Sequence, residues 1–175
     1  FESAYIFGDW ADYDSATKDK DVDAWGAMLD IGMKMGDLNI GAMYYYGSGD
    51  NDSDSDVESL MTANGGGIGK DFNPYYILNG DHTGMLNNDE YSANADMVKA
   101  GVHCIGIHTD YKVSEQLSLR GALAYAEADD APKDVGDEYG WEVDLGAKYK
   151  LLDNLTYEVR AAYFDADDFF DDTGE

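Results

Sequence analysis

Apolar and polar residues alternate with a period of two along several segments of the chain, and this pattern constrains the fold most. Residues 139–151 show it most clearly, because every odd position is apolar. These odd residues are Tyr139, Trp141, Val143, Leu145, Ala147, Tyr149 and Leu151. The even positions carry only glycine and charged side chains. Since successive side chains of a β-strand point to opposite faces, residues 139–151 are predicted to form a strand with one apolar and one polar face.

The same alternation recurs in four further segments, which are residues 25–35, 38–46, 117–126 and 155–164. Residues 97–112 alternate less regularly, and a β-bulge near Cys104 would restore the phase. Residues 3–11 form a seventh candidate. We therefore predict an all-β, antiparallel fold with seven visible strands, in one domain over residues 1–175.

The connections between these segments fall into two length classes. Three are tight turns rich in turn-forming residues, at 35–37, 113–116 and 152–154. Three are longer, acidic and polar, at 14–22, 47–95 and 127–138. Outer-membrane barrels have short periplasmic turns and longer extracellular loops. The regular switch between the two classes therefore favours such a barrel over a soluble β-sandwich.

The composition excludes some partners and some kinds of membrane segment. The formal net charge is −26, so the clustered basic surface that binds nucleic acid is not expected. No run of 18 apolar residues occurs, which excludes a transmembrane helix. A membrane-spanning strand needs only about 9–11 residues, of which half face lipid. The modest hydrophobic content therefore remains compatible with a membrane barrel.

Aromatic residues mark the ends of the apolar faces. They are Trp25, Tyr44, Tyr46, Tyr125, Tyr139, Trp141, Tyr149, Tyr157 and Tyr163. Aromatic rings with a polar tip favour the lipid–water boundary, and outer-membrane barrels carry such girdles at both ends. We therefore predict a transmembrane β-barrel in the bacterial outer membrane, in contact with its lipid and lipopolysaccharide. Bacterial barrels have even numbers of strands, so seven strands are interpreted as part of a larger barrel.

Charged residues gather on the polar faces, which would line the inside of a barrel. The predicted pore-lining residues are Lys34, Arg120, Lys148, Lys150, Arg160, Asp30, Glu142, Asp144 and Glu158. One interpretation is a basic ladder that guides anionic solutes. The other is that the cations neutralise the carboxylates in wall salt bridges, which the interleaving of both signs favours. The many inward Gly and Ala residues favour a water-filled lumen over a small filled barrel.

The long connection at 47–95 is unusual because it contains an apolar run, residues 72–78. Such a long loop usually has a function, and we expect this one to lie extracellularly or to fold into the lumen. Asp50, Asp52, Asp54 and Asp56 place carboxylates at alternate positions. They are a candidate calcium site, although a solvated acidic loop is the preferred interpretation. No other cofactor is expected.

Neither a second metal site nor a catalytic set is apparent. His103 and His108 are separated so that an unbroken strand points them to opposite faces, which argues against a shared metal ion. No Ser, His and Asp residues converge on one inferred face, so enzymatic activity is not expected.

Two short motifs resemble a known family. The sequence YYYGSGD at residues 44–50, an acidic loop and then DFNP at 71–74 resemble bacterial outer-membrane porins of the alginate-export type. Trimeric porins of sulfate-reducing bacteria are similar in their acidic, Tyr-rich strands. The resemblance implies a homotrimeric channel for passive diffusion of small hydrophilic, including anionic, solutes.

Three alternatives stand beside this channel. One is an eight-stranded structural or adhesive barrel whose acidic loops bind a partner or divalent cations. Another is an outer-membrane enzyme, which would need a convergent nucleophile and base. The third is a porin sheath around a haem protein, whose haems would belong to a partner because the chain has no Cys-x-x-Cys-His motif.

Overall fold

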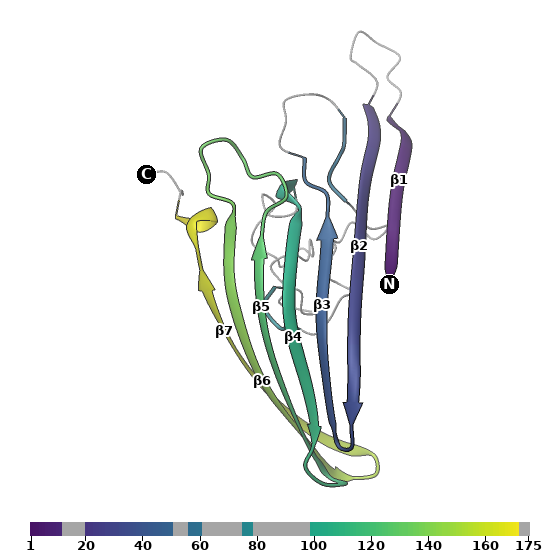
Figure 1. The fold of residues 1–175 in the computed structure, drawn as a ribbon, viewed down its shortest axis with the longest axis vertical. Helices are drawn as coiled ribbons and strands as arrows, with labels where there is room; N and C mark the ends of the chain where they lie inside the picture. The colour runs from purple at the N-terminus through teal and green to yellow at the C-terminus, as the bar shows by residue number, and fades with distance from the viewer. Residues whose placement is uncertain (12–19, 51–55, 61–74, 79–98, 172–175) are drawn as a thin grey trace.

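The computed structural model describes residues 1–11, 20–50, 56–60, 75–78 and 99–171. Seven strands form one antiparallel sheet in which neighbours in sequence are neighbours in space (Figure 1). They are β1 (Glu2–Ala11), β2 (Lys20–Met35), β3 (Leu38–Gly47), β4 (Val102–Lys112), β5 (Leu117–Glu127), β6 (Glu138–Leu152) and β7 (Leu155–Ala166). A short 3-10 helix, η2 (Asp168–Phe170), follows β7. The predicted all-β, antiparallel, seven-stranded fold is therefore confirmed for the described residues.

The three tight turns join β2 to β3, β4 to β5 and β6 to β7, and they lie together at one end of the sheet (Figure 1). Gly36 in the first turn has a φ of 62°, which glycine adopts without strain. In the second turn, the Ser114 hydroxyl accepts hydrogen bonds from the backbone N–H groups of Gln116 and Leu117, at 3.2 and 3.0 Å. The longer connections leave from the opposite end of the sheet (Figure 1). The predicted segregation of loop lengths is thus present.

The predicted bulge near Cys104 is wrong. β4 keeps one continuous register with both β3 and β5. The alternation is blurred because β4 carries apolar residues on both faces: Val102 and Cys104 are buried, whereas Ile105 is exposed on the other face. His103 and His108 consequently point to opposite faces, as an unbroken strand requires.

Tyr139 does not lie on the exposed apolar face, so its placement there was also wrong. The pairing of β5 with β6 shifts register between Ala126 and Glu127, which leaves Tyr139 as an extra residue. The neighbouring Gly140 has a φ of 121°, a conformation that other residues rarely adopt. This irregularity turns Tyr139 inward, where its ring is fully buried and its hydroxyl donates to the Gly101 carbonyl oxygen at 2.7 Å.

The sheet has two contrasting faces. We call the face that residues 75–78 cover the inner face and the opposite one the outer face. A cross-strand row on the outer face runs through Ile31, Ala42, Ile107, Leu123, Val143 and Tyr163. Its large members are all exposed, between 38% for Leu123 and 66% for Tyr163. The outer face is therefore an apolar surface that no described part of the chain covers.

The inner face divides into two halves along the strands. The loop-end half is buried and consists of Val22, Ala24, Met43, Tyr45, Val102, Cys104, Ala124 and Ala126. Leu60, Tyr75 and Leu78 from the long connection pack against it, as does Phe169 of η2. The turn-end half includes a row of mainly charged residues, Lys34, Asn39, Asp110, Arg120, Gly146 and Arg160. One set of strands thus supports both a packed core and a charged surface.

Candidate functional site

Two carboxylates of β6 hold a piece of the long connection against the inner face. Glu142 accepts hydrogen bonds from the backbone N–H groups of Tyr76 and Ile77 at Oε1, at 2.7 and 2.6 Å. Its Oε2 accepts from the N–H of Leu78 at 2.6 Å. Asp144 Oδ2 accepts from the N–H of Tyr76 at 3.1 Å. We call residues 75–78 the covering segment, because these bonds fix it over the centre of the sheet.

The strand period explains why both carboxylates reach the same segment. Glu142 and Asp144 are two positions apart on β6, so both point inward while Val143 points outward. Both are buried, at 0% and 1% exposed. A buried charge is costly unless hydrogen bonds replace its water. The three backbone N–H donors to Glu142 replace that water at both of its carboxylate oxygens.

Glycines of the wall accommodate the tyrosines of the covering segment. A Cβ on Gly106 would meet the Tyr75 hydroxyl, and one on Gly146 would lie 2.6 Å from the Tyr76 hydroxyl. Burial raises the pKa of Tyr75, so its hydroxyl keeps its proton. The expectation that inward glycines leave space for water does not hold at these two positions, because tyrosine side chains fill the space.

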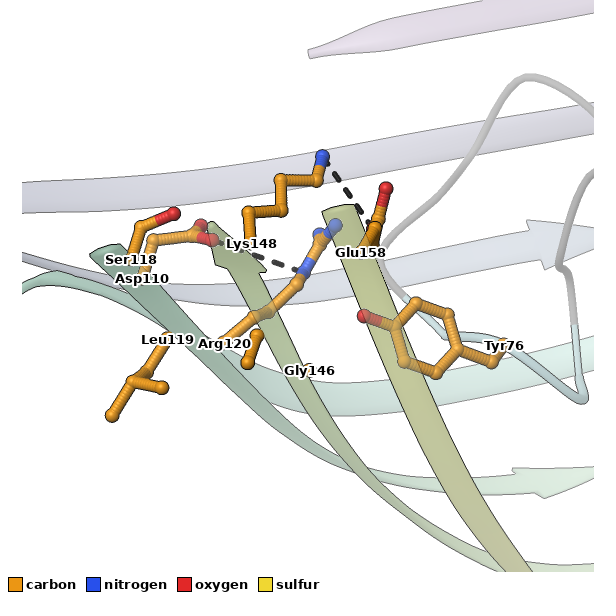
Figure 2. Close-up of a pocket in the computed structure, with 9 residues that line it drawn as sticks. Tyr76, Asp110, Ser118, Leu119, Arg120, Gly146, Lys148 and Glu158 are labelled. Carbon is orange, nitrogen blue, oxygen red and sulfur yellow. Dashed lines mark ion pairs between the residues drawn. The ribbon is translucent and has the colours of Figure 1, made fainter. Parts of the chain in front are cut away.

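The turn-end half carries a network of ion pairs (Figure 2). Lys148 Nζ lies 3.5 Å from Glu158 Oε1, and Arg160 Nε lies 2.7 Å from the same oxygen. Arg120 Nε is 4.0 Å from Asp110 Oδ1. The guanidinium carbon of Arg160 stands 5.0 Å from the centre of the Tyr76 ring, which is a cation–π distance. Tyr76 therefore connects the covering segment with the charged wall.

The remaining predicted pore residues lie on the same inner face. Asp30 contacts His108 Nε2 at 3.2 Å, and Lys150 pairs with Asp153 at 2.7 Å in the β6–β7 turn. Lys34 is exposed near the β2–β3 turn. Hence all nine residues share one face, but Glu142 and Asp144 lie beneath the covering segment rather than facing open space.

The acidic candidates for calcium act as hydrogen-bond acceptors where the structure describes them. Asp50 Oδ2 accepts from the N–H of Glu58 at 3.3 Å, and Asp56 Oδ1 accepts from the N–H of Asp21 at 3.3 Å. Asp52 and Asp54 lie outside the described residues. The calcium site remains a prediction.

A different acidic group was missed from the sequence. Carboxylate oxygens of Glu138, Asp167 and Asp168 lie within 4.8 Å of one another, which a metal ion could bridge. Asp168 Oδ1 also accepts a hydrogen bond from the N–H of Glu138 at 2.9 Å. The acidic run that ends β7 was the available signal, but its approach to β6 depends on the turn at η2.

A hydrogen-bonded chain at the loop end of the outer face was also missed. Tyr44 Oη lies 2.7 Å from His103 Nδ1, and His103 Nε2 lies 2.9 Å from Asp129 Oδ1. Asp129 Oδ2 accepts from the Tyr46 hydroxyl at 3.1 Å and from the Gly49 N–H at 3.0 Å. This chain ties the aromatic ends of β3 to the β5–β6 connection.

Comparisons of the chain with protein-family models, curated proteins and solved structures give no significant match. Within the part of the chain that the structure describes, no helix has the length and apolar character needed to cross a membrane.

Proposed function

We propose that this chain forms part of the wall of an antiparallel transmembrane β-barrel in the bacterial outer membrane. The observation that carries the proposal is the exposed apolar outer face. Large apolar patches on soluble proteins rarely exceed a few hundred Å², because exposing them to water is unfavourable. Here the apolar row through Ile31, Ile107 and Val143 crosses six strands. Contact with lipid gives this face an apolar environment.

Aromatic residues at both ends of the outer face support the same orientation. At the loop end, the rings of Trp25 and Tyr46 are 4.4 Å apart, and those of Tyr125 and Trp141 are 5.0 Å apart. At the turn end, Tyr149 and Tyr157 are paired across β6 and β7. Such rings favour the two lipid–water boundaries.

The barrel acts as a channel for passive diffusion of small hydrophilic solutes, including anionic ones. The charged turn-end half supplies the polar wall, and the covering segment narrows the passage at its loop side. Passage involves no covalent chemistry. By resemblance to outer-membrane porins, the working unit is a homotrimer in contact with lipid and lipopolysaccharide.

Membrane insertion and conduction can be tested separately. For insertion, brominated lipids are expected to quench tryptophan fluorescence, because Trp25 and Trp141 are both exposed on the outer face. Ile107→Arg on that face is expected to impair insertion, at a cost of about 2–4 kcal/mol near the bilayer midplane. Unchanged insertion of the variant would contradict the lipid-facing orientation.

Conduction is tested with the full-length protein in planar bilayers. Discrete single-channel steps are the expected result. Protein that inserts but never conducts would overturn the channel and leave the barrel intact.

A second candidate is a structural or adhesive barrel of eight strands whose acidic loops bind a partner or divalent cations. The filled loop-end half favours it, since small barrels pack their interiors with side chains such as Tyr45 and Tyr75. Insertion without conductance is the result that this candidate predicts.

A further inference from the structure

A small polar pocket lies on the turn-end half of the inner face and is lined by residues of β4, β5, β6 and β7 (Figure 2). Arg120, Lys148, Glu158 and Asp110 line it, and Tyr76 of the covering segment closes one side. Its volume is about 40 Å³. One water-sized sphere needs about 10–15 Å³, so the pocket holds about three or four non-hydrogen atoms, the number in a carboxylate or a phosphoryl group. That is the size of one acidic group rather than of a whole sugar.

Arg120 lies near the carboxylates of Asp110 and Asp144, but its Nε donates a hydrogen bond to neither. Its Nε is buried and makes no hydrogen bond within the described part of the chain. The nearest carboxylate oxygen, Asp110 Oδ1, is 4.0 Å away, which is beyond hydrogen-bond distance. A guanidinium offers five N–H donors in a fork that matches two oxygens of one anion. Arg120 therefore has capacity to bind another oxyanion.

The second cation that lines the pocket, Lys148, shares its carboxylate with Arg160. A single oxygen, Glu158 Oε1, serves both Lys148 and Arg160. Two cations, Arg120 and Lys148, and two carboxylates, Asp110 and Glu158, line the pocket. Arg160 lies near Glu158, and Asp144 lies near Arg120. The nearby Glu142 is directed to the backbone N–H groups of the covering segment and does not line the pocket. An anion at this pocket would therefore be bound by the donors of Arg120 and Lys148, and not by a local excess of positive charge.

We propose that this pocket binds a single oxyanion group, carboxylate or phosphate, of a solute that passes along the inner face. The group lies between the guanidinium of Arg120 and the ammonium of Lys148, and Tyr76 limits its depth. The binding site rests on the proposed channel function, because a solute reaches the inner face only along such a passage. It makes the passage selective for solutes that carry at least one acidic group.

The test is equilibrium binding to the purified full chain in detergent micelles, with sodium acetate and sodium phosphate as the probes. Titration calorimetry at low ionic strength is expected to show saturable binding of at least one probe, and weakening by salt. Tighter acetate binding would identify a carboxylate site, and tighter phosphate binding a phosphate site. If the wild-type protein binds neither probe saturably, the proposal is overturned.

Two single substitutions test whether the anion binds at the pocket. Arg120→Gln is expected to weaken it by about tenfold or more, since hydrogen bonds to a charged group are lost. Lys150→Gln removes the same charge from the same face, but at a residue paired to Asp153 in the turn, so binding is expected to stay within about twofold. Equal weakening by both variants would show a diffuse charge effect and refute the site.

The binding experiment tests the pocket and the conduction experiment tests the channel, so one proposal can be refuted without the other. The titration needs no membrane, so a protein that binds acetate but does not conduct overturns the channel and keeps the pocket. A protein that conducts but binds neither probe overturns only the pocket. Circular dichroism of each variant checks that the β-sheet is retained, and Arg120→Lys, which keeps the charge without the fork, is expected to bind with intermediate affinity.

Discussion

The loop-end and turn-end halves of the inner face belong to the same strands, yet they differ in almost every property. In the loop-end half, Ala24, Tyr45 and Cys104 are fully buried beneath the long connection. In the turn-end half, Lys148, Glu158 and Arg160 keep side-chain exposures of 53%, 31% and 48%. The strand period sets only which residues point inward. Whether an inward residue is buried or exposed to solvent depends on whether another part of the chain covers it.

Glu142 and Glu158 show the difference within one residue type. Both point to the inner face, from adjacent strands. Glu142 is 0% exposed and accepts three backbone N–H bonds, whereas Glu158 is partly exposed and pairs with two flexible cations. A buried carboxylate with fixed donors contributes to structure, while an exposed one chiefly sets the local charge.

The largest expected effect comes from Glu142→Gln. The amide keeps the shape of the side chain but replaces one acceptor oxygen with a donor that opposes a backbone N–H. We expect the free energy of unfolding to fall by about 3 kcal/mol, measured by urea titration of protein in lipid vesicles. A loss below about 1 kcal/mol would mean that the covering segment contributes little, and the contrast between the halves would fail.

Thiol labelling gives a second contrast. Cys104 is fully buried in the loop-end half, whereas Lys34 is exposed in the turn-end half. We expect a maleimide to label native Cys104 roughly a hundredfold more slowly than a cysteine introduced by Lys34→Cys in a Cys104→Ala background. Comparable rates would show that the loop-end half is open. Adding Glu142→Gln is expected to speed the labelling of Cys104, because it releases the covering segment.

Two wall glycines provide a smaller effect. Gly106→Ala would bring a Cβ against the Tyr75 hydroxyl and to 2.5 Å from the Leu123 carbonyl oxygen, so we expect a loss of about 2 kcal/mol. Gly32→Ala meets nothing closer than 3.8 Å and is expected to change stability by less than about 0.5 kcal/mol. The same urea titration measures both, and equal losses would argue that glycine itself, rather than the tyrosine above it, matters.

Glu158→Gln is expected to have the smallest effect on stability. Its ion pairs are partly exposed and screened by water, so the loss should be about 0.5 kcal/mol and should shrink with added salt. A salt-independent loss above about 2 kcal/mol would place Glu158 in the same class as Glu142 and erase the distinction between the two halves.

Most strands were predictable from the sequence because an apolar outer face and a polar or small-residue inner face produce alternation along them, whereas β4 has apolar residues on both faces. The ends and irregular points were not predictable. Gly140 turns Tyr139 from the outer face to the core through a local backbone conformation that the pattern of residue types does not reveal. β2 begins at Lys20 rather than at residue 25, because Val22 and Ala24 are core residues of β2 beside polar neighbours.

The charged residues were placed on the correct face, but their roles required tertiary information. Nothing local distinguishes Glu142 from Glu158, since both alternate with apolar residues. The difference arises from donors at Tyr76, Ile77 and Leu78, which come from a distant part of the chain. The sequence could indicate that the apolar run at residues 72–78 is unfavourable in water. It could not indicate which carboxylates would accept hydrogen bonds from its backbone.

The fit between wall glycines and the tyrosines above them has an evolutionary consequence. Gly106 leaves room for Tyr75, and Gly146 leaves room for Tyr76. A mutation that enlarges either wall position brings a side chain against the facing tyrosine, so we expect each glycine and its tyrosine to change together rather than separately.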